Sequence, residues 1–121
     1  VISAGMMDAW ILQWPWDGFQ ELLLIGQTVS KYEGCVVWVN LMDGSGFPAP
    51  GIDPEAIRRS DSFNAALDYW TTRFPNMRVV DWNGEVLAQG VDRLLQPWNP
   101  HANDEGQRVL AGMVDDTVST C

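Results

Sequence analysis

The sequence predicts a single α/β domain over residues 1–121, in which helices cover both faces of a parallel sheet to give three layers, α/β/α. Hydrophobic residues make up 46% of the chain, which is enough for a substantial core. Apolar runs alternate with amphipathic segments, at distances that suit βαβ units with long loops. Right-handed crossovers then make the sheet parallel. Three strands are few for such a sheet, so we expect a truncated one.

Three apolar runs are predicted to be the strands: residues 1–5, 35–42 and 77–82. The middle run is apolar almost throughout, which is typical of a strand buried on both faces. The first run begins at Val1, without a methionine or a leader, and would leave a strand edge bare. We therefore expect another protein chain, or residues preceding Val1, to cover the edge at residues 1–5.

The first helix is predicted over roughly residues 18–32, because Asp17 can cap its start and Gly34 can end it. Its apolar residues recur on or near one face, which we expect to point toward the core. These residues are Phe19, Leu22, Leu23, Val29 and Tyr32.

Two separate helices are predicted between the second and third strands, after a loop at residues 43–51 that is rich in Gly and Pro. The first is predicted to be capped by Asp53 and to run from Pro54 to about Arg59. The second is predicted to be capped by Ser60 or Asp61 and to end at Pro75. Its apolar residues lie at near-helical spacing: Phe63, Leu67, Trp70 and Phe74.

The last third of the chain is predicted to hold a turn, an irregular segment and one long helix. Asn83 and Gly84 suggest a turn, and residues 86–100 are expected to be irregular or to contain one helical turn. The last helix is predicted to start at Asn103 or Asp104. Its inward-facing residues are expected to be Val109, Leu110, Met113 and Val114.

Net charge and composition exclude several classes of function. The formal charge of −9, with only seven Lys and Arg, argues against binding nucleic acid or an anionic membrane surface. No apolar run is long enough to span a bilayer, so we expect a soluble chain. No set of His, Cys and Asp has metal-ligand spacing, and no Gly-rich phosphate loop is present. We therefore predict neither a metal nor a cofactor.

The two cysteines do not constitute a disulfide framework. Cys35 opens the middle apolar run and is predicted to be a small buried hydrophobic residue. Cys121 is the last residue, and we expect it to be chemically silent or, in an oxidising compartment, to cross-link two chains.

His101, the only histidine, is the first candidate for a functional residue. It lies in a loop ahead of the last helix and after the third strand, at the carboxyl edge of the predicted sheet. Open α/β sheets collect ligands and catalytic groups at this edge. Two interpretations remain open for His101: a general base, or an ordinary exposed loop residue.

Three segments together resemble a known family. They are Gly5-Met6-Met7-Asp8, residues 74–82 (Phe-Pro-Asn-Met-Arg-Val-Val-Asp-Trp), and residues 101–111 (His-Ala-Asn-Asp-Glu-Gly-Gln-Arg-Val-Leu-Ala). In this order they resemble the C-terminal half of SGNH (GDSL-type) serine esterases, particularly actinobacterial ones, over nearly the whole chain. The resemblance implies a flavodoxin-like fold and hydrolysis of esters or acyl esters. It also implies that His101 is the general base and that the Gly5 N–H belongs to the oxyanion hole.

The chain departs from the family at three functional positions. The Gly-Asp-Ser block with the nucleophilic serine is missing, and Ser45 is more simply a loop serine. Met7 stands where the family has its oxyanion-hole asparagine, and a thioether has no N–H to donate. Trp98 stands where an aspartate would orient His101. The resemblance therefore implies that a serine must come from a missing segment or another chain, and that this chain alone is inactive.

Other residues are expected to line the cleft. Asp8 and Asp43 are candidates, although a helix cap or a turn is the simpler explanation of Asp8, and a turn formed by Asp-Gly is the commoner explanation of Asp43. Trp98, and the cluster of Trp10, Trp14 and Trp16, would give an aromatic platform for a sugar or an acyl chain, or would serve ordinary packing. Two hypotheses follow: half of an esterase acting on a small ester or acyl ligand, or a non-catalytic module that binds a glycan, an acyl group or a protein. In either case a secreted or cell-envelope location is a possibility that the residues leave open.

Overall fold

A computed structural model describes residues 1–4, 19–48, 51–97 and 99–121 as a mixed α/β fold. Strands β1 (Val36–Val39) and β2 (Met77–Val80) pair in parallel, with Trp38 opposite Val79. On the other side of β1, Ile2 forms a parallel bridge with Trp38. Its N–H donates to the Val37 carbonyl at 2.8 Å and its carbonyl accepts from Val39 at 2.9 Å. The predicted parallel order of the three segments is confirmed, although the first is a single bridge among the described residues.

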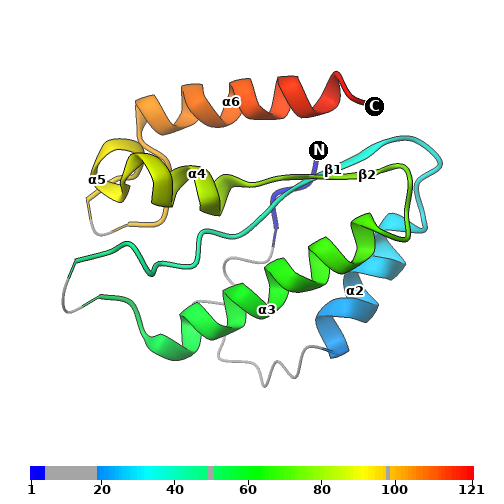
Figure 1. Ribbon diagram of the computed structural model, residues 1–121, viewed down its shortest axis with the longest axis horizontal. Coiled ribbons are helices and arrows are strands. Elements are labelled where there is room, and N and C mark those ends of the chain that lie inside the picture. Colours follow the sequence, from blue (N-terminus) through cyan, green and yellow to red (C-terminus); the bar gives the residue numbers. More distant parts are fainter. Residues whose placement is uncertain (5–18, 49–50, 98) are drawn as a thin grey trace.

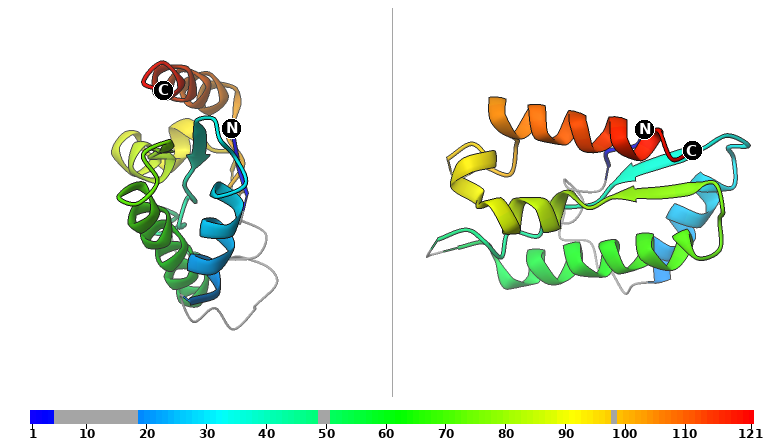
Figure 2. Two further views of the ribbon diagram at one scale, coloured as in Figure 1. Left: turned by 90° about the vertical axis from the view of Figure 1, so that its right-hand side faces the viewer. Right: turned by 45° about the horizontal axis from the view of Figure 1, so that its top comes forward.

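Helices lie on both sides of these strands (Figure 1). Helices α2 (Phe19–Val29) and α3 (Pro54–Thr71) pack on one face. The other face meets α4 (Trp82–Gln89), α5 (Val91–Leu94) and, most distant from α3, α6 (Asp104–Val118). Two further views show the sheet between α6 and the pair α2 and α3 (Figure 2).

The alternation of side chains along β1 divides the core into two clusters. Val36 and Trp38 face α2 and α3, where the Trp38 and Phe63 rings lie 5.9 Å apart. Val37 and Val39 face the other side and pack against residues of α4, α5 and α6. Because helices cover both faces, all four residues of β1 are buried, as the uninterrupted apolar run predicts.

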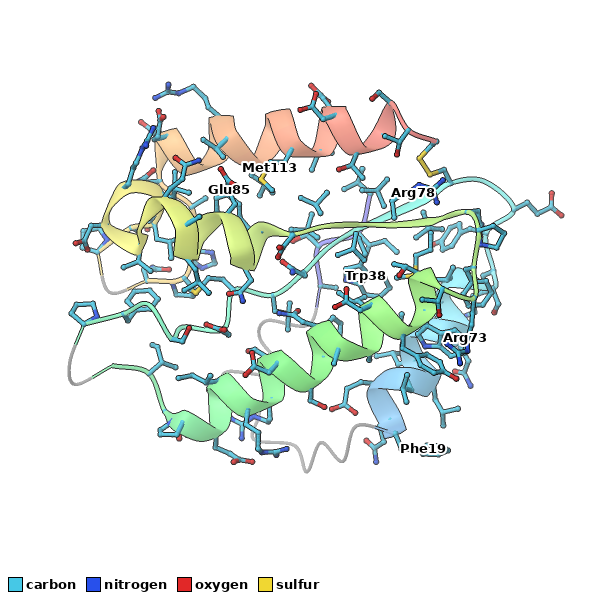
Figure 3. The ribbon with its side chains drawn as sticks, viewed as in Figure 1. Phe19, Trp38, Arg73, Arg78, Glu85 and Met113 are labelled. Atoms are coloured by element: carbon cyan, nitrogen blue, oxygen red, sulfur yellow. A yellow bond between two sulfur atoms is a disulfide. The ribbon has the colours of Figure 1, made fainter. Side chains whose placement is uncertain are left out.

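The buried face of α2 differs from the predicted one. Phe19, Leu23 and Tyr32 are 63%, 46% and 55% exposed, and Phe19 points away from the molecule in Figure 3. The buried face instead includes Ile25 and a Gly26 that the Trp70 ring covers. The prediction was wrong for Phe19 and Leu23 because apolar residues lie on more than one face of α2, and for Tyr32 because α2 ends before it, at Val29.

The two helices predicted between residues 54 and 75 are one helix, α3. Ser60 was predicted as a cap, but its side chain is buried and its hydroxyl donates to the Ala56 carbonyl at 3.0 Å. This bond, four residues back along the helix, lets a serine continue a helix instead of starting one. Asp53, the cap that the sequence does identify, accepts from the Glu55 N–H at 3.0 Å.

The segment after β2 is more helical than predicted. The Asp81 side chain accepts from the Gly84 N–H at 2.9 Å, so Trp82 begins α4 instead of ending the strand. Asn83 and Gly84 therefore lie in a first helical turn, not in a connecting turn. Gly90, with φ of 101°, ends α4 and precedes α5. The last helix, in contrast, begins at Asp104, one of the two predicted starts, and Asn103 caps it.

The cysteines form a disulfide, which corrects the prediction for both. Cys35 and Cys121 are bonded across a sequence separation of 86 residues, with their Cα atoms 5.8 Å apart. Cys35 is exposed rather than buried, because it precedes β1 and lies outside the core. The bond is compatible with an extracellular location. Within the described ranges, no helix has the length and apolarity needed to cross a membrane.

Candidate functional site

The loop between α5 and α6 places His101. The loop is closed by an antiparallel bridge between Leu95 and Ala102, and the His101 carbonyl accepts from the Gln96 N–H at 2.9 Å. The His101 N–H donates to Asn99 Oδ1 at 3.0 Å. These bonds hold the backbone, while the residue is exposed. The imidazole is therefore on a fixed loop and accessible to a ligand.

A cavity of about 330 Å³ lies beside His101. Its described walls come from segments far apart in the sequence, namely the end of the opening segment, the end of β1, the start of α4, the His101 loop and α6. The lining residues are Ser3, Ala4, Val39, Asn40, Leu41, Trp82, Pro100, His101, Ala102 and Leu110. Because β1 and the Ile2 segment run in parallel, this is the carboxyl edge of the strands, where ligands are expected.

The chemistry of this cavity is mainly apolar. Most of its lining residues are apolar, among them Val39, Leu41, Trp82 and Leu110, and its volume is at the small end of the range for ligand pockets. The polar groups among its described walls are few: the Ser3 hydroxyl, the Asn40 amide and the His101 imidazole. A small ligand with an apolar part and one polar group near the imidazole fits this arrangement.

Hydrogen bonds between the ends of β1 and β2 fix the sheet side of the cavity. Asn40 Nδ2 donates to Asp81 Oδ1 at 2.8 Å, and Asn40 Oδ1 accepts from the Asn83 N–H at 2.8 Å. Both groups of the Asn40 amide are thus engaged with residues on either side of Trp82. The Trp82 ring, buried in the core, is held as a rigid wall.

Asp43 belongs to the same region but has a structural role. Its carboxylate accepts from the Ser45 N–H at 2.7 Å, which closes the turn that the Asp-Gly pair predicts. Its second oxygen accepts from Asn83 Nδ2 at 3.1 Å, and its own N–H donates to Asn83 Oδ1 at 2.9 Å. Partial burial raises the pKa of the nearby Asp61, and the Asp43 carboxylate raises it further. Ser45 is exposed in this turn.

The Asn103 side chain fixes the other end of the His101 loop. Its Oδ1 accepts from the Gly106 N–H at 2.9 Å, and its Nδ2 donates to the carbonyls of Arg93 and Leu95 at 2.9 and 3.1 Å. Its backbone N–H donates to the Leu94 carbonyl at 2.9 Å. One side chain therefore caps α6 and ties it to α5, only two residues after His101.

Several predicted site residues lie outside the described residues: Gly5, Met7, Asp8 and Trp98. The same holds for Trp10, Trp14 and Trp16. Their roles stay predictions. The structure does bring His101 together with Ser3 and Ala4, the residues immediately before Gly5.

Sequence reasoning missed Ser3, Asn40 and Leu110 as cavity residues. A signal was available for Asn40, since an amide that directly follows a buried strand stands at the ligand-binding edge. Among the residues described, no three or more His, Cys, Asp and Glu side chains gather where they would hold a metal ion. Comparisons of the chain with protein-family models, with curated proteins and with solved structures found no significant match.

Proposed function

We propose that this chain is the histidine-bearing, C-terminal part of an SGNH-type serine esterase, completed by a serine from another segment or another chain. The observation that carries the proposal is the shared cavity: His101 and the end of the opening segment line it together, at the carboxyl edge of parallel strands. The resemblance of the three sequence segments to the SGNH family supports the type of reaction and the role of His101. The same cavity would bind a small ester or acyl ester.

The proposed reaction is acyl transfer through a serine. His101 accepts the proton of the serine hydroxyl as the oxygen attacks the ester carbonyl, and then gives that proton to the departing alcohol. Water, activated by the same imidazole, releases the acid and restores the serine. The walls formed by Val39, Leu41 and Trp82 would bury the acyl group. The Gly5 N–H would stabilise the oxyanion.

A second candidate function is binding without catalysis. Met7 and Trp98 replace groups that assist the chemistry in the family, and losing one oxyanion-hole donor typically costs about 10²–10³ in rate. An apolar cavity with an exposed imidazole also suits a binding site for an acyl group or a glycan. In this case the chain is an assembly module. A partner chain that covers the edge at residues 1–5 belongs to both candidates.

Labelling with a fluorophosphonate tests the esterase proposal. The native protein, isolated with any partner, is treated with the probe, and the modified serine is located by mass spectrometry. We expect one adduct, on a serine outside this chain's 121 residues. The His101→Ala variant should lose the adduct and should cleave short nitrophenyl esters about 10²–10⁴ times more slowly. Arg108→Ala, an exposed change on α6, is the matched control and should leave both unchanged.

Other outcomes separate the alternatives. An adduct on Ser3, which lines the cavity, would show that the nucleophile lies in this chain and would overturn the need for a second segment. No adduct, together with unchanged ester cleavage in His101→Ala, would reject the esterase. The binding module then predicts that butyrate or a soluble oligosaccharide shifts the NMR signal of the only histidine. A Trp98→Ala variant that keeps every such interaction would count against it.

A further inference from the structure

Helix α6 is attached to the rest of the molecule in different ways at its two ends. Its first turn follows the His101 loop and is held by the hydrogen bonds of Asn103. Gly106, in this turn, packs so closely against the Leu94 carbonyl that it leaves no room for a side chain. Glu105 adds an ion pair with Arg93 at 3.7 Å. The first turn is therefore fixed by contacts that do not involve sulfur.

The last turns of α6 are held to the rest of the molecule by the apolar contacts of Met113 and Val114 and by the disulfide. Among the described residues, the hydrogen bonds of residues 113–121 stay within the helix and its C-terminal turn. Cys121 follows the helix and is bonded to Cys35, just before β1 (Figure 3). Both cysteines are exposed, so a reductant in solution can reach the bond. The disulfide is the one covalent attachment of this end to the sheet.

Packing beneath α6 is shallow. Gly106 is its one buried residue; Val109, Leu110, Met113 and Val114 are half-buried against the sheet, and Val118 is 45% exposed. In Figure 3 the Met113 side chain points from α6 toward the strands. Half-buried side chains lose less hydrophobic free energy on leaving the sheet than fully buried side chains would. Leu110, in the middle of the helix, is also a wall of the His101 cavity.

We propose that the Cys35–Cys121 disulfide is a redox-sensitive latch that controls the His101 cavity through α6. In the oxidised state it holds the C-terminal half of α6 on the sheet, and Leu110 closes one side of the cavity. In the reduced state this half of the helix detaches while Asn103 keeps the first turn in place, and the cavity widens at Leu110. The biological meaning of the latch rests on the proposed function of the cavity, but its mechanics do not.

The switching step is thiol–disulfide exchange with a dithiol. A thiolate of the dithiol attacks one sulfur of the Cys35–Cys121 bond and forms a mixed disulfide, and the other cysteine leaves as a thiolate. The second thiol of the reductant then attacks the mixed disulfide and closes its own disulfide. Two electrons and two protons pass from the dithiol to the protein, which ends with two free thiols. Oxidation by a small disulfide reverses the step.

Hydrogen exchange measured by mass spectrometry tests the latch. The oxidised protein is compared with the same protein reduced by dithiothreitol. We expect amides of residues 113–119 to exchange roughly tenfold faster or more after reduction, while β1, β2 and the first turn of α6 keep their protection. The NMR signal of His101 should shift on reduction, because its cavity changes shape. A Cys35→Ser/Cys121→Ser variant should behave as the reduced protein with or without dithiothreitol.

Ser119→Ala is the matched control, since it alters the same C-terminal turn and keeps both sulfurs; it should respond to dithiothreitol as the wild type does. Equal exchange of residues 113–119 in the oxidised and reduced proteins would overturn the latch. Loss of protection in β1 and β2 together with α6 would also overturn it, because the disulfide would then hold the whole fold. Neither readout requires a serine or an ester, so the esterase proposal and the latch fail separately.

Discussion

Replacing Asn103 by alanine should destabilise the protein well beyond an ordinary loop substitution. Asn103 caps α6 through Gly106 and donates two further hydrogen bonds to the carbonyls of Arg93 and Leu95. Loss of an N-cap costs about 1 kcal/mol, and each further hydrogen bond contributes about 0.5–1.5 kcal/mol. The expected loss in the free energy of unfolding is therefore about 2–4 kcal/mol. For a chain of this size, this corresponds to a decrease in Tm of roughly 8–16 °C.

Urea and thermal denaturation followed by circular dichroism measure this loss. Asn103→Asp separates the contributions, because aspartate retains the cap but places a negative charge against two carbonyl oxygens. Its free energy of unfolding should therefore be lower than that of the wild type. Asn99→Ala is the control in the same loop. It loses a single exposed hydrogen bond to the His101 N–H and should cost less than about 1 kcal/mol. Equal stabilities of Asn103→Ala and Asn99→Ala would refute the role of Asn103 as the clamp of the loop.

Three other substitutions should change the stability of the fold, two of them upward and one downward. The folded protein raises the pKa of Asp61 above its ordinary 3.8, so its stabilising contribution is complete below that value and is lost as pH rises through the raised pKa. Asp61→Asn should therefore raise Tm at pH 7 but not at pH 3, and an equal gain at both would contradict this. In Gly26→Ala the new methyl group meets the Trp70 ring, so we expect a loss of about 1–2 kcal/mol in urea denaturation, whereas Gly112→Ala, in open space on α6, should gain about 0.5–1 kcal/mol. Equal stabilities of the two alanine variants would argue against the contact.

The elements that the sequence predicts well are those whose cause is local. The residues of β1 are apolar without interruption because helices cover both faces of the strand, and the cap at Asn103 is visible in the residues themselves. The inward face of α6 is predicted for the same reason, since only one stripe of that helix is apolar. In α2, by contrast, apolar residues surround much of the helix, and tertiary packing decides which are buried: the Trp70 ring covers Gly26, and Ile25 joins the core cluster.

The errors occur where a distant or competing contact decides. Ser60 has the character of a cap, but its hydroxyl bonds to a carbonyl of the preceding turn, so α3 continues. Asn83 and Gly84 form a common turn pair, yet the Asp81 side chain accepts a hydrogen bond from the Gly84 N–H and caps the start of α4. The pairing of Cys35 with Cys121 depends on how α6 returns along the sheet, which residues 86 positions apart do not reveal. Likewise, the cavity joins segments that only the tertiary fold brings together.

The two sides of the His101 cavity differ in rigidity, and this difference links the proposed site to its proposed regulation. On the sheet side, Asn40 bonds to residues on both flanks of Trp82, and the Trp82 side chain is buried in the core. On the other side, Leu110 belongs to a helix whose residues are mostly half-buried and whose far end is tied by an exposed disulfide. The cavity can therefore change its shape by movement of the α6 side, and not by movement of the Trp82 side. Any ligand-dependent or redox-dependent motion of this site should move Leu110 and leave Trp82 in place, whether the chain serves catalysis or binding.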